Sequence, residues 1–127
     1  PQPARAASAV RSSEGDGVQV YYFYGTYRCV TCRAIEAYTR EAVARGFQDE
    51  LRKGLLRWNP VNVELPENQH FIRDFQLTTR SVVLADRKDG RPVRWKNLDQ
   101  VWYVVGDRET FVSYIQDEVR AFLEAGR

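Results

Sequence analysis

Hydrophobic and polar positions alternate along the chain in stretches that switch between strand and helix periodicity. Residues 18–24, VQVYYFY, form an unbroken β-branched and aromatic run, which predicts a buried strand. After a break at Gly25, apolar residues recur at helical spacing within residues 35–51. This spacing predicts one long helix over residues 30–52 with a single apolar face.

The pattern in the middle of the chain predicts a second strand, then a helix, and then a hairpin of two strands. Residues 55–64 are typical of a strand, and residues 66–77 of a helix that begins with a proline. Residues 81–86 and 91–96 read as two strands joined by the turn KDG. Because a proline cannot donate a ladder hydrogen bond, Pro92 predicts that the last strand lies at an edge.

The C-terminal part predicts two helices. Asn97, with Gln100 three positions later, matches a capping box before a short helix. Asp107 is placed to cap the last helix, and Gly126 to end it. The inner face of that helix is marked by four apolar residues at helical spacing: Phe111, Ile115, Val119 and Phe122.

The order of these elements favours an α/β fold. A strand, a helix and a second strand at the start favour parallel pairing through a right-handed crossover. The later hairpin adds an antiparallel pair. We therefore expect a mixed four-stranded sheet with flanking helices, in a three-layer α/β/α arrangement.

The chain divides into a lead-in and one domain. Residues 1–16 are rich in Ala, Ser, Pro and Gly, which predicts a flexible segment, whereas residues 17–127 carry the fold. The first residue is Pro and methionine is absent, so a signal or anchor removed upstream is expected. This reasoning favours an extracytoplasmic location and leaves a cytoplasmic one open.

Composition excludes two classes of partner. The net charge is +2, from 19 basic and 17 acidic residues, which is too balanced for nucleic-acid binding. The mildly basic residues 86–96 are interpreted as a solvated hairpin. No apolar run approaches the roughly 20 residues that span a bilayer. We expect a monomer.

Cys29 and Cys32, the only cysteines, lie between the first strand and the long helix. A disulfide across two intervening residues closes a very small loop and stabilises the fold little, so a purely structural bridge is unattractive. At a helix start, unpaired N–H groups and the positive end of the dipole stabilise a thiolate. We expect Cys29 to attack a partner protein disulfide from the exposed tip, and Cys32 to resolve the intermediate. In the reverse direction, the Cys29–Cys32 disulfide oxidises a partner protein dithiol.

Side chains next to the cysteines extend this hypothesis. Arg28 and Arg33 flank the pair, and their positive charge favours a thiolate. Tyr27 lies in the loop before Cys29, where we expect it to line a groove for the partner. Thr31, between the two cysteines, is assigned to the same groove.

Four blocks of sequence carry a resemblance to a known family: YYFYGTYRCVTCRAIEAY, VNVELPENQHFIRDFQL, SVVL and WKNLDQVW. They resemble the thioredoxin-like family labelled "nitrophenyl compound nitroreductase subunit ArsF". The resemblance covers residues 17–126 and implies the thioredoxin fold and an accessory redox subunit. No flavin or nicotinamide fingerprint is present, so no cofactor is expected.

The sequence departs from typical thioredoxins at positions that matter for mechanism. Arg28 replaces the tryptophan before the first cysteine, and Val30-Thr31 replaces Gly-Pro. Phe23 occupies the position of a buried aspartate, six residues before the first cysteine, that assists proton transfer in thioredoxins. A general base must then be water or another side chain.

A further departure lies before the third strand. Thioredoxins place a cis-proline there, facing the disulfide, whereas Arg80-Ser81 takes that place here. The face above the cysteines is then more open, and an inward-pointing Arg80 would stabilise a thiolate. These departures favour a dedicated exchanger with one partner over a general reductase.

Two alternatives stay open. The same cysteines, Cys29 and Cys32, suit Cu(I) or another thiophilic ion in a binding module without turnover. A degenerate fold that serves only protein interaction is less favoured, because both cysteines remain at the reactive location. His70, the single histidine, is interpreted as a partly exposed structural residue.

Overall fold

The computed structural model describes residues 16–126 of the chain. The predicted lead-in, residues 1–16, lies outside the described residues except for Asp16. Four strands form the sheet: β1 (Gly17–Tyr24), β2 (Leu56–Asn62), β3 (Ser81–Lys88) and β4 (Arg91–Asn97). The helices are α2 (Val30–Gly46), α3 (Gln48–Arg52), the 3₁₀ turn η1 (Pro66–Asn68), α4 (His70–Asp74), α5 (Val101–Val104) and α6 (Arg108–Ala125).

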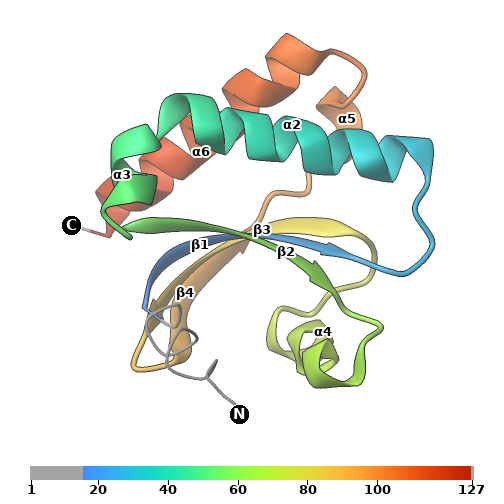
Figure 1. The fold of residues 1–127 in the computed structure, drawn as a ribbon, viewed down its shortest axis with the longest axis horizontal. Coiled ribbons are helices and arrows are strands. Elements are labelled where there is room, and N and C mark those ends of the chain that lie inside the picture. Colours follow the sequence, from blue (N-terminus) through green and yellow to red (C-terminus); the bar gives the residue numbers. More distant parts are fainter. Residues whose placement is uncertain (1–15, 127) are drawn as a thin grey trace.

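The sheet has the mixed topology that the sequence predicts. Its strand order is β2-β1-β3-β4, with β1 parallel to β2, and β3 antiparallel to both β1 and β4. Helices α2, α3, α5 and α6 cover one face of the sheet and α4 covers the other (Figure 1). This is a thioredoxin-like α/β fold. The edge strands β2 and β4 carry Pro60 and Pro92, in line with the loss of a ladder donor at proline.

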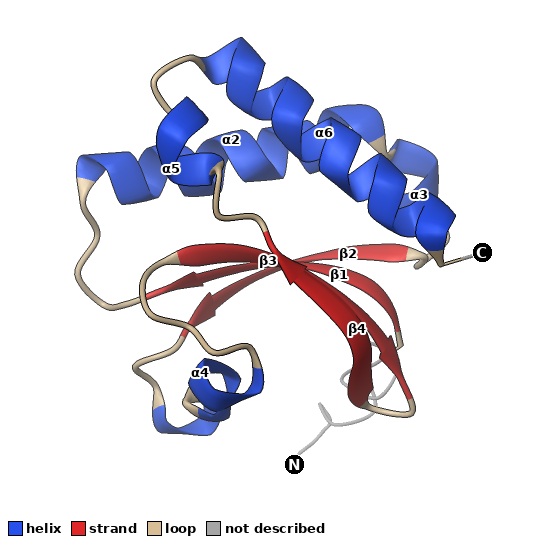
Figure 2. Ribbon diagram, turned by 180° about the vertical axis from the view of Figure 1, so that it is seen from behind, coloured by secondary structure: helices blue, strands red, loops and turns tan. Residues whose placement is uncertain are grey.

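Alternation along β1 divides the aromatic run between the two faces. Tyr22 is buried with the residues of α2 and α6, and Tyr24 packs against the same cluster. Tyr21 and Phe23 point to the opposite face, where they join Phe75 under the α4 side. Viewed from behind, the sheet lies as a twisted layer between these two groups, with a thin α4 layer below (Figure 2). Two of the four aromatics therefore lie on each face, as alternation along a strand requires.

The α2–α6 pair forms the main helical layer. Ile35 and Val43 from α2 are buried with Phe111 and Ile115 from α6. Asp107 caps α6, because its carboxylate accepts hydrogen bonds from the backbone N–H groups of the first turn. Both the predicted cap and the predicted inner face of this helix are confirmed.

The single long helix expected over residues 30–52 is wrong. The chain leaves helical geometry at Phe47 (φ −139°, ψ 41°), so α2 ends at Gly46 and α3 begins at Gln48. Gln116 of α6 donates a hydrogen bond of 3.1 Å to the Ala42 carbonyl. A Cβ at Gly46 would stand 2.9 Å from the Gln116 amide nitrogen, so a larger residue there would displace the Gln116 side chain. The bend lets Phe47 bury its ring.

Two smaller expectations also need correction. The helix expected over residues 66–77 is only η1 and the short α4, and the chain then runs as a loop to β3. Asn97 ends β4 instead of capping a helix, because its backbone pairs with Val83. Helix α5 starts four residues later without a side-chain cap. Within residues 16–126, no helix combines the length and apolar character needed to cross a membrane.

Candidate functional site

The candidate site is a disulfide at the first turn of α2. Cys29 is the N-cap residue of the helix and is bonded to Cys32. Cys29 is half-buried, whereas Cys32 is only 3% exposed. The two sulfurs therefore have the unequal exposure that the sequence predicts, with Cys29 the one that another molecule can reach.

The start of α2 directs its dipole at the Cys29 sulfur. Cys29 has an extended backbone (φ −86°, ψ 166°), and its Sγ accepts a hydrogen bond of 3.0 Å from the Cys32 N–H. The Cys29 carbonyl accepts the first helical bond, from the Arg33 N–H at 3.0 Å. A sulfur in the N-cap position replaces the oxygen of a usual cap. Negative charge on this sulfur is favoured by the donor and by the helix dipole.

Tyr22 supports the site from beneath. Its hydroxyl, buried on β1, donates a hydrogen bond of 2.9 Å to the Cys32 carbonyl. Burial raises the pKa of Tyr22 to about 12, and the positive charges of Arg28 and Arg80 offset part of that rise. The hydroxyl therefore stays protonated near neutral pH and positions the Cys32 peptide, and it does not act as a base there.

The role of Tyr22 was not predicted from the sequence, because the position six residues before Cys29 is its neighbour Phe23. Phe23 lies on the opposite face of the sheet, with its ring centroid 5.1 Å from that of Phe71 and 5.7 Å from that of Phe75. The alternation of β1 contained the necessary signal, because only one of the two neighbours can face α2.

The two flanking arginines differ in their surroundings. Arg28 forms an ion pair with Glu36 on the next turns of α2, and its guanidinium lies 4.2 Å from the centroid of the Tyr24 ring. Arg33 is exposed and has no hydrogen bond or ion pair from its side chain within residues 16–126. The positive charge of Arg28 is thus partly neutralised, and that of Arg33 is not.

Arg80 joins the loop before β3 to the loop before α2. Its guanidinium donates a hydrogen bond of 2.8 Å to the Tyr27 carbonyl, two residues before Cys29. The Arg80 carbonyl in turn accepts a bond of 3.2 Å from the indole N–H of Trp102. Ser81 is buried, and its hydroxyl donates to the Thr79 carbonyl at 2.8 Å. Ser81 therefore holds its own turn and does not face the surface.

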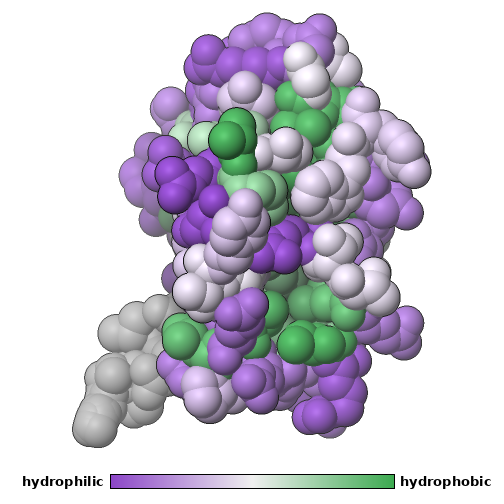
Figure 3. Space-filling view, turned by 90° about the vertical axis from the view of Figure 1, so that its right-hand side faces the viewer, coloured by the Kyte–Doolittle hydropathy of each residue, from purple (hydrophilic) through white to green (hydrophobic). Residues whose placement is uncertain are grey.

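A hollow of about 180 Å³ opens beside the same loop. Phe23, Val63 and Leu77 contribute apolar lining, and Glu64 and Arg80 contribute charge. A Cβ at Gly25 would stand 2.5 Å from a Glu64 carboxylate oxygen, so a larger residue there would displace the Glu64 side chain. The end view shows the surface hollowed between the upper and lower layers, with hydrophobic side chains among hydrophilic ones (Figure 3).

The exposed residues around Cys29, here called the crest of the site, are open to solvent. Tyr27 is 73% exposed and Val30 is 87% exposed, on either side of Cys29. Thr31 is also exposed, on the first turn of α2. The structure thus brings Tyr27, Thr31 and Cys29 to one outer surface.

The residues described hold no further metal-ligating cluster. No group of three or more His, Cys, Asp or Glu side chains stands close enough together within residues 16–126 to hold an ion. The His70 ring lies 4.1 Å from the Phe71 ring, tilted by 36°, and His70 Nδ1 lies 2.8 Å from the Asp74 carboxylate. His70 is thus a partly exposed histidine with local structural partners.

Comparison with known proteins gives low similarity. No protein-family model matches the chain, and a search of curated proteins finds no match. Among solved structures, a thioredoxin from Fasciola hepatica is 20% identical, with 85% of this chain and 89% of that chain covered and a TM-score of 0.43. A Trichomonas vaginalis thioredoxin is 16% identical (86% and 92% covered, TM-score 0.45), and a Thermus thermophilus thioredoxin 20% identical (76% and 68% covered, TM-score 0.45).

These superpositions are loose, and nothing about activity follows from them. Strand order and direction carry the assignment to the thioredoxin-like fold. The narrower resemblance to the ArsF family stays a prediction. A thioredoxin-like fold with a C-x-x-C disulfide at a helix start suggests thiol–disulfide redox chemistry.

Proposed function

We propose that the protein performs or relays thiol–disulfide exchange with a dedicated partner protein through Cys29 and Cys32. The observation that carries the proposal is the half-exposed Cys29 sulfur at the N-cap of α2, 3.0 Å from a backbone N–H and bonded to a buried partner. A thiolate formed there is stabilised and within reach of another molecule.

In the reduced protein, Cys29 thiolate attacks one sulfur of a partner disulfide. The partner S–S bond breaks, its other sulfur leaves as a thiolate, and a mixed disulfide joins Cys29 to the partner. Cys32 then loses its proton to solvent and attacks the Cys29 sulfur. The second partner sulfur leaves, so the partner gains two electrons and the Cys29–Cys32 pair loses two.

The reverse reaction starts from the disulfide form. A partner thiolate attacks the Cys29 sulfur, and Cys32 leaves as a thiolate. The second partner thiol then loses its proton to solvent and attacks the partner sulfur bonded to Cys29, so the partner disulfide forms and Cys29 leaves as a thiolate. Which direction prevails depends on the reduction potential of the pair against that of the partner.

The neighbouring residues take supporting roles in this proposal. Tyr27 and Thr31 contact the partner segment that approaches Cys29, because both are exposed at the crest. Arg28, Arg33 and Arg80 add positive charge around the thiolate, with Arg80 also holding the Tyr27 loop. We extend the proposal to the finer assignment, an accessory redox subunit of the ArsF type, which rests on the four resembling blocks of sequence.

The first test is the reduction potential, measured by equilibrating the protein with glutathione buffers. Exchange predicts a value between about −120 and −270 mV, the range of known exchangers. A potential far below about −300 mV would mean a bond that resists exchange, and would contradict the proposal.

The second test identifies the partner. Cys32→Ser removes the resolving sulfur, so the mixed disulfide on Cys29 persists and can be isolated from cell extract. Cys29→Ser is the matched control and should trap nothing, because Cys32 is buried. Equal trapping by both variants would contradict the assigned order of the two cysteines.

Copper binding by the same cysteines is the competing hypothesis from the sequence. Only the reduced pair offers thiolate ligands, and the residues described supply no third donor beside them. No observation therefore favours this carrier over exchange. Stoichiometric copper that survives dialysis after purification under reducing conditions would reverse that preference.

A further inference from the structure

An arginine cluster lines the outer side of α2 beside the disulfide. Arg28, Arg33 and Arg40 surround Glu36 at a shallow hollow of about 340 Å³. Arg33 and Arg40 are seven positions apart, two helical turns, so both lie on one stripe of the helix. Ala37, four positions after Arg33 and three before Arg40, shares this stripe and also lines the hollow.

The charge of this cluster is not balanced within the described residues. The hollow is lined by three arginines and one carboxylate, Glu36, and the ion pair of Glu36 is with Arg28. Arg33 and Arg40 are exposed, and neither side chain has an ion pair or hydrogen bond within residues 16–126. Such a patch attracts anionic groups over a distance set by ionic strength.

The position of the cluster ties it to the reactive sulfur. The Arg33 N–H donates to the Cys29 carbonyl, so the stripe begins at the first turn of the helix. From Arg33 it runs about 10 Å along α2 to Arg40. A protein segment whose cysteine reaches Cys29 and that continues along α2 must lie against these arginines.

We infer that the arginine cluster selects a partner whose segment beside the reacting cysteines is acidic. Carboxylates of Asp or Glu match the planar fork of a guanidinium, and their attraction speeds the encounter. The inference rests on the proposed exchange function and names the chemistry of its protein substrate. A basic partner segment is repelled by the same groups.

The test compares two cyclic peptide disulfides that differ only in glutamates or lysines beside the first cysteine. Fully reduced protein is mixed with each, and the reduced peptide is quantified by chromatography after acid quenching. At about 0.01 M salt we expect the acidic peptide to react at least about tenfold faster, within the range that steering provides. At about 1 M salt, where the Debye length is about 3 Å, the ratio should approach one.

Two double variants separate the cluster from total charge. Arg33→Glu with Arg40→Glu should abolish or invert the preference for the acidic peptide. Lys88→Glu with Arg91→Glu is the matched control, because it changes net charge equally at the far β3–β4 turn. Those two residues pair across the strands, so like charges remain like in the control.

Reduction of neutral hydroxyethyl disulfide is measured in parallel. A wild-type protein that reduces it but treats both peptides alike would overturn the inference and leave the exchange function standing. A preference that survives in the Arg33→Glu/Arg40→Glu variant, or that vanishes equally in the control, would also overturn the inference. Failure to reduce the neutral disulfide would overturn the exchange function itself, and the inference with it.

Discussion

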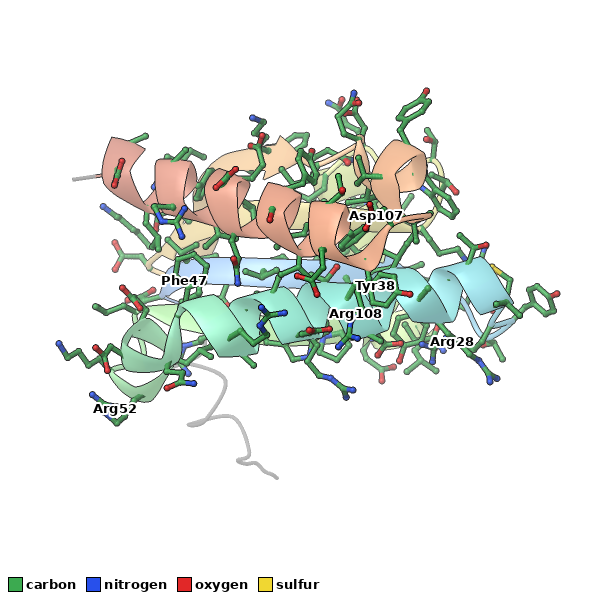
Figure 4. The ribbon with its side chains drawn as sticks, turned by 90° about the horizontal axis from the view of Figure 1, so that it is seen from above. Arg28, Tyr38, Phe47, Arg52, Asp107 and Arg108 are labelled. Carbon is green, nitrogen blue, oxygen red and sulfur yellow. A yellow bond between two sulfur atoms is a disulfide. The ribbon has the colours of Figure 1, made fainter. Side chains whose placement is uncertain are left out.

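The two sides of α2 carry similar charged side chains in different surroundings. On the outer side, Arg33 and Arg40 have no ion-pair or hydrogen-bond partner within residues 16–126, and the disulfide lies at the open end of the helix. On the side toward α6, Glu41 accepts hydrogen bonds from Arg45 at 2.7 Å and from Arg108 of α6 at 2.9 Å. Seen from above, Arg108 extends toward α2 near its middle, whereas Arg28 lies at the far end (Figure 4).

The comparison indicates that one side of α2 stabilises the fold and that the other is available to bind a partner. Where α2 lies against α6, its apolar residues are buried and its charges are paired, with Tyr38 edge-on to Phe111 at 5.7 Å. On the outer side, the charges of Arg33 and Arg40 are exposed to solvent or to another molecule. Changes on the side toward α6 should therefore alter stability, and changes on the outer side should alter exchange.

The largest expected effect is the loss of exchange in Cys29→Ser. The serine hydroxyl does not ionise near neutral pH, and Cys32 is buried, so the rate should fall at least about a hundredfold. Assays with hydroxyethyl disulfide measure this rate. The free energy of unfolding should stay near that of the reduced wild type. A large loss of stability in this variant would show that Cys29 has a structural role instead.

The next effect belongs to the α2–α6 contact. Ile115→Ala leaves a cavity at a fully buried position and should lower the free energy of unfolding by about 2–5 kcal/mol. Chemical denaturation measures this loss. The folded fraction should still exchange at the wild-type rate. A lower exchange rate per folded molecule would show that the α2–α6 contact and the disulfide site are coupled.

Tyr22→Phe should have an intermediate effect. It removes the hydrogen bond to the Cys32 carbonyl and should cost about 1 kcal/mol of stability at pH 7. Because the folded-state pKa of about 12 lies above the ordinary 10.0, the Tyr22 contribution is complete below pH 10 and declines as pH rises toward 12. Wild type and variant should therefore converge in alkaline denaturation.

A phenolate titration provides the control for Tyr22. The pKa of Tyr114 is also raised to about 12, mainly by burial, and that phenol should titrate unchanged in Tyr22→Phe. The variant should have one fewer phenol titrating near this pH. If the phenol lost in the variant had titrated near the ordinary pKa of 10.0 in the wild type, the burial of the Tyr22 hydroxyl would be contradicted.

The smallest effect is expected from Glu41→Gln on the surface. Hydrogen bonds from Arg108, and then from Arg45, hold the pKa of Glu41 below its ordinary value of 4.5. Its contribution to stability is therefore present above pH 4.5 and is lost as pH falls through the lowered pKa. Thermal unfolding at pH 7 should show a slight loss in the variant that disappears in acid. A loss of equal size at both pH values would rule out the ion pairs as its cause.

The sequence predicted those parts of the fold where local pattern and burial agree. The run in β1 is buried on both faces, and Asp107 stands directly before four apolar residues at helical spacing, so strand and capped helix both formed as expected. The end of α2 could not be predicted in this way. There the chain turns at Phe47, whose ring is buried in the core, and Gln116 contacts the Ala42 carbonyl from 74 positions along the chain.

The sequence predicted where the two cysteines of the candidate site lie, and it did not predict the side chains that support them. The position of Cys29 and Cys32 between a strand and a helix is a local pattern, and the structure places both as expected. The contacts of Arg80 with the Tyr27 carbonyl and of Arg28 with Glu36 depend on side-chain conformation, which spacing does not fix. Tyr22 is different, since strict alternation in β1 already indicated its direction.

The central claim is tested most directly by titrating the Cys29 thiol in reduced Cys32→Ser protein, through the ultraviolet absorbance of the thiolate. A helix start that stabilises the charged sulfur predicts a midpoint clearly below the value of about 8.5 for an unperturbed thiol. A midpoint at or above that value, or a sulfur that stays unreactive toward a small alkylating reagent while the protein is folded, would contradict the account.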